Sequence, residues 1–340
     1  MNIQVAVYNN LDDIKYSSYY KFYKNIKASI FYSWEFLLAV EKFPLLPTVK
    51  VFYIVASSGD ELVGFLPLYL QKNVDPFNVL SQNTGYLFTK DTSGLFSHIM
   101  HVSDSKILVL DTPSNLIVDK ILGCVKDIQL DEKIDCCGIL NIDTNCLNYT
   151  TDIFQKHDFK INLMWNRYKT NVFKYRELSE IIQNLPSNGR REVNRQIRKY
   201  NLTESSVEWK NIKDMDLNVV VNLIYDTTNK YGTAAYYPKD AMYNFLTNCD
   251  KIAKIIEIKC SNHVVGVGVV FLDNDTLHLW AVGINYKISD YSPYTILYVN
   301  LYKYAISNNY KTIEVGRTTQ SIKERLGFSA VPLQSIINFS

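Results

Sequence analysis

The chain lacks several features that whole classes of protein require. Its 340 residues carry a net charge of only +2, with 36 basic residues against 34 acidic ones, so no overall field favours nucleic acid or an anionic membrane. The longest apolar run, VVGVGVVFL at 264–272, is far shorter than the roughly 20 residues of a membrane-spanning helix. The first residues, MNIQVAVYNN, lack the basic start and apolar core of a secretory signal. We therefore expect a cytoplasmic protein without a membrane span.

Metal ligands and common catalytic motifs are also missing. The six cysteines show no metal-ligand spacing, and we interpret them as thiols in a reducing compartment. His98 and His101 are three residues apart, but no carboxylate or cysteine follows at ligand spacing, so we predict no metal site and interpret them as part of a surface loop. No Ser–His–Asp arrangement, P-loop or glycine-rich dinucleotide motif is present.

The chain has enough apolar residues for more than one core. Hydrophobic residues make up 47% of it and charged residues 21%, which excludes a disordered protein. A length of 340 residues is typical of two domains rather than one.

The two halves predict a similar order of elements. The second half predicts a helix, three antiparallel strands, a helix with Ser292 as N-cap and Pro293 in its first turn, a strand, a short helix and a closing strand, at 217–232, 253–286, 292–310, 311–317, 321–327 and 331–339. The first half predicts a helix, a hairpin, a helix, a strand, a short helix and a strand, at 33–43, 49–71, 114–129, 136–143, 149–159 and 160–173. This repeated order indicates a duplicated domain, although two unrelated α/β domains could also share it.

A basic helix is predicted between the halves, within 177–202. Arg191, Arg195 and Arg198 recur at helical spacing with Lys199 beside them, so the four cations share one face. Such a stripe is either a clamp for the phosphates of a substrate or carrier, or a solvated linker helix.

The segment EVGRTTQSIKERLGF, at 314–328, ends a predicted strand with donors and cations. Arg317 and Lys323 could stabilise an oxyanion, while Gly327 and Phe328 are typical of a packing corner. In the strand TLHLWAVG, Thr276, His278 and Trp280 share one face, so His278 is a candidate general base or a structural histidine.

Four segments together resemble the GNAT acyltransferase superfamily, and more narrowly its Fem-like branch of peptidoglycan-biosynthesis-type, aminoacyl-tRNA-dependent transferases. They are RREVNRQIRKY, YGTAAYYPKDAMYNFL, LHLWAVGINYKISDYSPYTILYVNLYKYAISNNYKTIEVGR and KERLGF, and the likeness spans roughly 185–335. The resemblance implies an α/β (α+β) fold of tandem GNAT-like domains with mixed sheets flanked by helices. We expect an N-terminal domain at 1–176, a basic linker region at 177–200 and a C-terminal domain at 201–340.

The resemblance also implies a reaction, in which an activated acyl group moves to an amine of a small molecule or peptide. The donor would be a co-substrate rather than a permanently bound cofactor: aminoacyl-tRNA, an acyl-carrier thioester or acyl-CoA. Most acyl-CoA users carry a glycine-containing loop before the helix that cradles the pyrophosphate, whereas this chain has NYKISDYSPYT, with no glycine and with Pro293 removing an N–H donor. We therefore favour aminoacyl-tRNA or another carrier. The alternatives are an acyl-CoA enzyme with atypical binding and a non-catalytic binding module.

The sequence pattern and the resemblance together predict site residues, but they do not predict the oligomeric state. The resemblance assigns a functional position to Lys323. The candidate catalytic residues are Lys323, Arg317 and His278. Candidates for substrate binding are Trp280, Tyr236, Tyr237, Tyr294, Thr318 and Gln320, and those for carrier or phosphate binding are Arg191, Arg195, Arg198 and Lys199.

Overall fold

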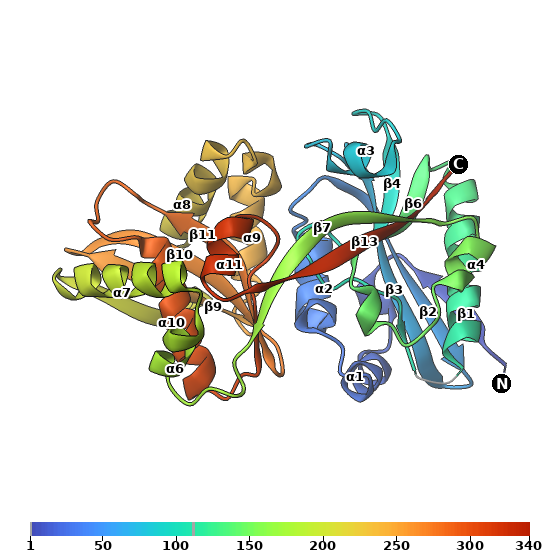
Figure 1. Ribbon diagram of the computed structural model, residues 1–340. Coiled ribbons are helices and arrows are strands. Elements are labelled where there is room, and N and C mark those ends of the chain that lie inside the picture. Colours follow the sequence, from blue (N-terminus) through green and yellow to red (C-terminus); the bar gives the residue numbers. More distant parts are fainter. Residues whose placement is uncertain (1, 111–112) are drawn as a thin grey trace. The chain divides into compact units, whose positions relative to one another are not determined.

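A computed structural model describes residues 2–110 and 113–340, which form two compact units (Figure 1). Unit 1 contains the chain up to Trp165 together with Pro332–Ser340, and unit 2 is Asn166–Val331. In the part of the chain that is described, none of the helices has the length and apolarity needed to cross a bilayer.

The elements follow the predicted order in both halves. Those of the first half are β1 (Gln4–Tyr8), α1 (Tyr16–Asn25), α2 (Trp34–Lys42), β2 (Thr48–Ser58), β3 (Glu61–Lys72), α3 (Val79–Thr84), β4 (Ser93–Ser97), β5 (Leu108–Val109), α4 (Ser114–Asp131), β6 (Cys136–Ile142), α5 (Asp152–Lys156) and β7 (Lys160–Asn171). Those of the second half are α6 (Leu178–Asn184), α7 (Ser187–Asn201), β8 (Ser205–Asn211), α8 (Leu217–Lys230), α9 (Lys239–Thr247), β9 (Ala253–Cys260), β10 (His263–Leu272), β11 (Thr276–Ile284), α10 (Pro293–Ser307), β12 (Thr312–Glu314), α11 (Gln320–Arg325) and β13 (Ser329–Phe339).

The sheets of the two units have the same topology. In unit 1 the strand order is β1-β2-β3-β4-β6-β13, with β4 and β6 parallel and the other neighbours antiparallel. In unit 2 it is β8-β9-β10-β11-β12-β7, with β11 and β12 parallel and the other neighbours antiparallel. This agreement confirms the expected α/β fold of two duplicated domains with mixed sheets.

The last strand of each repeat belongs to the sheet of the other. Strand β7 starts in unit 1, but its end pairs with β12 in unit 2 through Asn171 and Thr312. Strand β13 starts in unit 2, but Gln334–Phe339 pairs with β6 in unit 1. The units therefore differ from the expected domains: the first division falls at 165/166 rather than 176/177, residues 332–340 join unit 1, and α7 packs in unit 2 against α10. Backbone pairing between distant segments sets the boundaries of the two units, and the amino-acid composition does not reveal this pairing.

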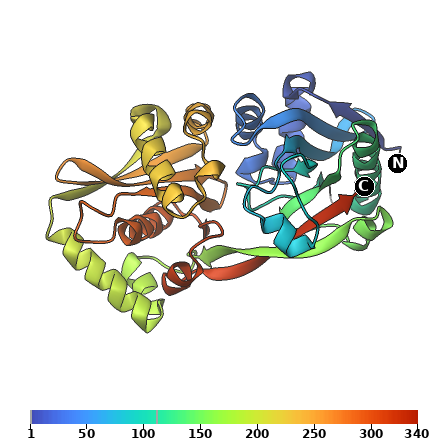
Figure 2. The same cartoon turned by 90° about the horizontal axis from the view of Figure 1, so that it is seen from above.

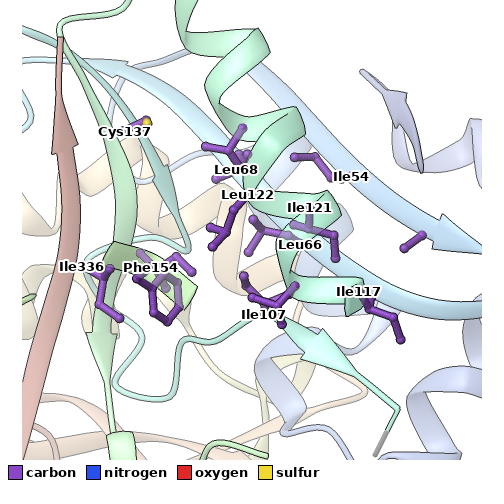
Figure 3. Packing of buried hydrophobic residues seen from close by; sticks show 14 of the residues in the cluster. Ile54, Leu66, Leu68, Ile107, Ile117, Ile121, Leu122, Cys137, Phe154 and Ile336 are labelled. Atoms are coloured by element: carbon purple, nitrogen blue, oxygen red, sulfur yellow. The ribbon is translucent and has the colours of Figure 1, made fainter. Parts of the chain in front are cut away.

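The core of unit 1 forms where α4 lies on its sheet (Figure 3). Ile117 and Ile121, one helical turn apart, are both fully buried and lie near Leu66 of β3. Phe154 of α5 and Ile336 of β13 complete the same cluster, so residues far apart in sequence share one core.

In unit 2 helices lie on both faces of the sheet, with α8 packed on β11 and α10 on β10 (Figure 2). Helix α10 begins as predicted: the Ser292 side chain accepts a hydrogen bond from the Thr295 N–H, and Pro293 is its first residue. This places the start of α10 beside the ends of the central strands of unit 2.

Candidate active site

Strands β11 and β12 separate at the point where the predicted polar segment begins. Their pairing runs from Thr276–Thr312 to His278–Glu314, and β11 then continues to Ile284 beside β10. The chain after Glu314 stays with β7 instead, because Tyr168 exchanges backbone hydrogen bonds with Val315 and Gly316. Gly316 has a φ of 71°, which favours glycine, and Arg317 follows directly after this turn. The polar segment therefore begins where the chain leaves β11.

Glu314 is the buried centre of this region. Its Oε2 lies 3.1 Å from Nδ1 of His278, and its Oε1 accepts a 2.9 Å hydrogen bond from the Gly316 N–H. Burial opposes ionisation, but the hydrogen bond and charge of His278, the charge of Arg167 and the Gly316 N–H together outweigh it, so the pKa of Glu314 lies below its usual range. Glu314 is therefore ionised, as expected for a carboxylate that pairs with nearby cations.

His278 lies between two carboxylates. Besides Glu314, its Nε2 lies 3.5 Å from Oδ2 of Asp273, and the side chain is buried. Burial disfavours the imidazolium, but the bonds to Asp273 and Glu314 prevail and raise the pKa of His278 to about 9. An imidazolium cannot accept a proton at neutral pH, so this geometry fits the structural alternative rather than a general base.

Lys323 is buried, although it lies on the short helix α11. Only 2% of the residue is exposed, so Lys323 is not a solvated helix residue. Its Nζ lies 5.3 Å from the centre of the Tyr168 ring. Burial lowers the pKa of Lys323 to about 7, with Glu314 opposing this shift and Arg317 adding to it. An amine that titrates near neutral pH can hold or release a proton during a reaction.

Arg317 is half-buried and directly follows the turn at Gly316. Burial lowers the pKa of its guanidinium, while Tyr236, Tyr237 and Glu314 interact with it electrostatically in the opposite sense. Burial raises the pKa of Tyr237 to about 12, so that phenol is a neutral donor beside the cation. The predicted catalytic pair Arg317 and Lys323 is thus brought together with two of the predicted substrate-binding tyrosines.

The other predicted substrate-binding residues fall into two groups. Trp280 is half-buried, and its ring packs edge-on against Tyr237 with centroids 5.5 Å apart. The Tyr294 hydroxyl lies 2.7 Å from that of Tyr298 and 3.1 Å from the Thr319 Oγ1. Thr318 and Gln320 are exposed. Trp280 thus joins the tyrosines beside Arg317, whereas Tyr294 bonds to the residue just before α11.

The predicted basic stripe lies on α7, and its members differ in their contacts. Arg195 forms two hydrogen bonds, of 3.0 and 2.8 Å, with the Glu192 carboxylate one turn earlier. Lys199 donates to the backbone oxygen of Asp290 at 2.9 Å. Arg191 and Arg198 are exposed. All three guanidinium groups of the stripe are thus exposed, but that of Arg195 is paired with Glu192, and Lys199 is bonded to a backbone oxygen.

Helix α7 also occupies a backbone donor at the N-terminus of α10. Gln196 accepts a 2.7 Å hydrogen bond from the Ser292 N–H. The Thr295 N–H bonds to the Ser292 side chain, and Pro293 has no N–H. Three of the positions that could cradle a pyrophosphate at this helix N-terminus thus offer no donor to a ligand.

Gly327 and Phe328 form the predicted packing corner. Gly327 has a φ of 91°, and a side chain there would meet Leu185 at 2.7 Å. The Phe328 ring packs against those of Tyr298 and Tyr302, with centroids 5.5 and 5.6 Å away. This corner anchors the end of α11 and so fixes the position of Lys323.

In unit 1 the matching region is filled by the chain itself. Pairing between β4 and β6 ends at Ser97–Ile139, and the following segment packs over the end of β6. There the Asn141 side chain donates to the backbone oxygens of Met100 and Val102, at 3.3 and 2.8 Å. We therefore assign the candidate site to unit 2.

The two histidines in that unit 1 segment are buried rather than on a surface loop. His98 bonds to the backbone oxygen of Phe31 at 2.8 Å, and burial lowers its pKa to about 4. His101 is also buried. Among the described residues, no group of three or more metal-binding side chains comes together.

Sequence reasoning missed part of the charged cluster. Arg167 of β7 is almost fully buried and interacts electrostatically with Glu314. Asp273 pairs with His278 from the turn before β11, and Gln196 occupies the Ser292 N–H. An arginine inside the predicted strand KINLMWNRYKTNVF was the only available signal for Arg167, since charged residues are rarely buried unless paired.

Comparison with known proteins identifies the second half. Residues 187–324 match the family model described as Acetyltransferase (GNAT) domain. No curated protein matches the chain.

Solved structures with the same fold match nearly the whole chain. FemX is 11% identical, with a TM-score of 0.65, and the match covers 99% of this chain and 97% of FemX. A tandem GNAT protein from the clavulanic acid biosynthesis pathway is 9% identical, with a TM-score of 0.59 and coverage of 99% and 98%. L-PGS from Bacillus licheniformis is 8% identical, with a TM-score of 0.56 and coverage of 95% and 91%. Residues 187–324 therefore resemble a GNAT acetyltransferase domain, and the chain as a whole has the fold shared by FemX and the tandem GNAT protein.

Proposed function

We propose that the protein transfers an aminoacyl group from aminoacyl-tRNA to the amine of a small molecule or peptide and so forms an amide. The amine nitrogen attacks the ester carbonyl, a C–N bond forms, and the C–O bond to the ribose breaks. The proton lost by the amine ends on the released ribose hydroxyl. Because an ester is replaced by an amide, the enzyme mainly has to hold the reactants together and stabilise the oxyanion.

The observation that carries this proposal is the closed start of α10. The Gln196–Ser292 bond, the Thr295 cap and Pro293 leave little there for a pyrophosphate to bind. An acyl-CoA donor would lose its usual anchor, whereas most of a tRNA donor would lie outside this helix N-terminus. The exposed guanidinium groups of Arg191 and Arg198 on α7 suit the phosphates of such a carrier.

The cations at the turn suit the chemical step. Arg317 and protonated Lys323 would stabilise the oxyanion of the tetrahedral intermediate. Trp280, Tyr236 and Tyr237 would line the acceptor, and Tyr294, Thr318 and Gln320 would contact the donor end. Deep burial of Lys323 strengthens the electrostatic stabilisation that its charge provides, because water screens the charge little.

The donor can be tested directly by mass spectrometry. We expect amide products when the protein is incubated with an amine pool and charged tRNA, and none when acyl-CoA or acyl-carrier thioesters replace the tRNA. The Lys323→Met variant is the background control, because it keeps the fold while removing the ammonium group. Products formed from acyl-CoA alone would overturn the proposed donor and favour atypical CoA binding.

The basic stripe gives a second prediction. Replacing Arg191, Arg195 and Arg198 together with glutamine should weaken tRNA binding and reduce the slope of log affinity against log salt by about 0.7–0.9 for each lost phosphate contact. Filter binding at several salt concentrations measures both. A matched control removes three exposed cations elsewhere in unit 2, by changing Lys174, Arg176 and Lys213 to glutamine. Equal losses in the two triple variants would show a general charge effect and remove the stripe from the binding site.

A further inference from the structure

Glu314 faces more cations than its local hydrogen bonds require. One oxygen pairs with His278 and the other holds the Gly316 N–H, while Asp273 supports the far side of His278. The charged and titratable groups that act on Glu314 come from every element around it: His278 of β11, Arg167 of β7, Tyr298 of α10, and Arg317 and Lys323 after β12.

This arrangement ties two properties of the site to one carboxylate. The bond from Gly316 to Glu314 holds the left-handed turn from which Arg317 projects. Lys323 lies against the same turn, because a Cβ at Gly316 would meet its Nζ at 3.9 Å. The charge of Glu314 attracts the ammonium of Lys323 there, while burial and Arg317 both disfavour it. Tyr168 of β7 is the remaining titratable group against Lys323, and as a neutral phenol it supplies only its ring.

We propose that Glu314, oriented by the Asp273–His278 pair, is a positioning residue that fixes the turn carrying Arg317 and keeps a proton on Lys323. This inference rests on the proposed function, because it assigns the roles of those two cations in oxyanion stabilisation. It adds that the site depends on a buried carboxylate that need not contact either substrate.

The deciding variant is Glu314→Gln, which keeps an acceptor for the Gly316 N–H but removes the charge. The pKa of Lys323 should then fall by about one unit or more, because an attractive charge is lost while burial remains. If the substitution merely loosened the structure, water would enter the site and the pKa of Lys323 would rise instead. The sign of the change therefore separates an electrostatic role from a merely structural one.

The titration is read without substrate, by NMR of protein labelled at the lysine side-chain carbons, with the Lys323 signal assigned from its loss in Lys323→Met. Glu324→Gln is the matched control: Glu324 lies next to Lys323 in sequence but is exposed, so its loss should leave the titration unchanged. An unchanged or raised pKa of Lys323 in Glu314→Gln overturns the inference. Should that variant not fold, His278→Gln replaces a cation by a neutral donor, and the pKa of Lys323 must then rise while amide exchange in 312–316 stays unchanged. No rise, or a rise accompanied by faster exchange there, overturns the inference.

The same variant predicts a kinetic result. If the pKa of Lys323 falls by about one unit from about 7, the protonated fraction of Lys323 at pH 7 becomes about fivefold smaller. The descending alkaline limb of the pH–rate profile should then move to lower pH by about one unit as well. A shifted titration without any product from charged tRNA would reject the proposed donor and leave the role of Glu314 intact. A shifted titration with an unmoved alkaline limb would overturn the inference that this proton serves the reaction.

Discussion

Lys323→Met is expected to lower turnover by about 100-fold, equivalent to about 3 kcal/mol, with a much smaller effect on substrate affinity. The reason is that a buried ammonium acts most strongly where negative charge develops, which is in the transition state. Methionine fills a similar volume, so the variant avoids the cavity that alanine would leave. Single-turnover kinetics with charged tRNA measure the chemical step apart from binding.

The same variant should gain stability at low and neutral pH. In the folded protein the pKa of Lys323 is about 7, well below the ordinary value of lysine, so burial of the ammonium destabilises the fold fully at pH values below about 7. This penalty disappears as the pH rises from about 7 towards the ordinary lysine value near 10.4, above which both states are neutral. Lys323→Met should therefore unfold at a higher temperature than the natural protein at pH 6, with a smaller difference at pH 9.

Two outcomes would contradict this reading of Lys323. Near-normal turnover would remove Lys323 from the mechanism and leave Arg317 as the stabilising cation. A loss of affinity with unchanged turnover would instead make Lys323 an anchor for a phosphate or carboxylate. Lys323→Arg is the informative intermediate, and we expect only partial activity because the planar guanidinium is larger than an ammonium.

Ile336→Ala is expected to destabilise unit 1, although position 336 follows the whole of unit 2 in the sequence. Ile336 is fully buried in the unit 1 core, where β13 pairs with β6. Truncating a buried isoleucine typically costs about 2–5 kcal/mol of folding free energy. Hydrogen exchange measures where this cost falls, and we expect faster exchange of amides in 136–142 while those in 263–272 are unchanged.

The matched control is Ile296→Ala, the same truncation at a buried site of α10 in the core of unit 2. Its effect should be the reverse, with faster exchange in 263–272 and little change in 136–142. If Ile336→Ala loosened the strands of unit 2 instead, β13 would belong with the half of the chain that precedes it, and the exchange of last strands would be refuted.

Local features of the sequence determined the order of the elements and several of their limits. Ser292 and Pro293 fixed the start of α10, because a hydroxyl cap and a missing N–H both suit the first turn of a helix. The similar endings at 114–172 and 292–340 revealed the repeat, since each encodes a helix, a strand, a short helix and a strand. The polar segment after Glu314 likewise marked the place where Arg317 and Lys323 come together.

Only the tertiary structure decided which strands pair and which charges are buried. Nothing in the composition of β7 and β13 distinguishes the sheet of one unit from that of the other, because strand edges offer the same backbone groups. The position of Lys323 in a short helix does not predict its burial, which depends on Tyr168 and on the corner formed by Phe328. His278 suggested a base, yet two carboxylates from separate segments hold its proton. The pKa of a buried group is set by neighbours that the chain brings together only on folding, so a local sequence pattern cannot report it.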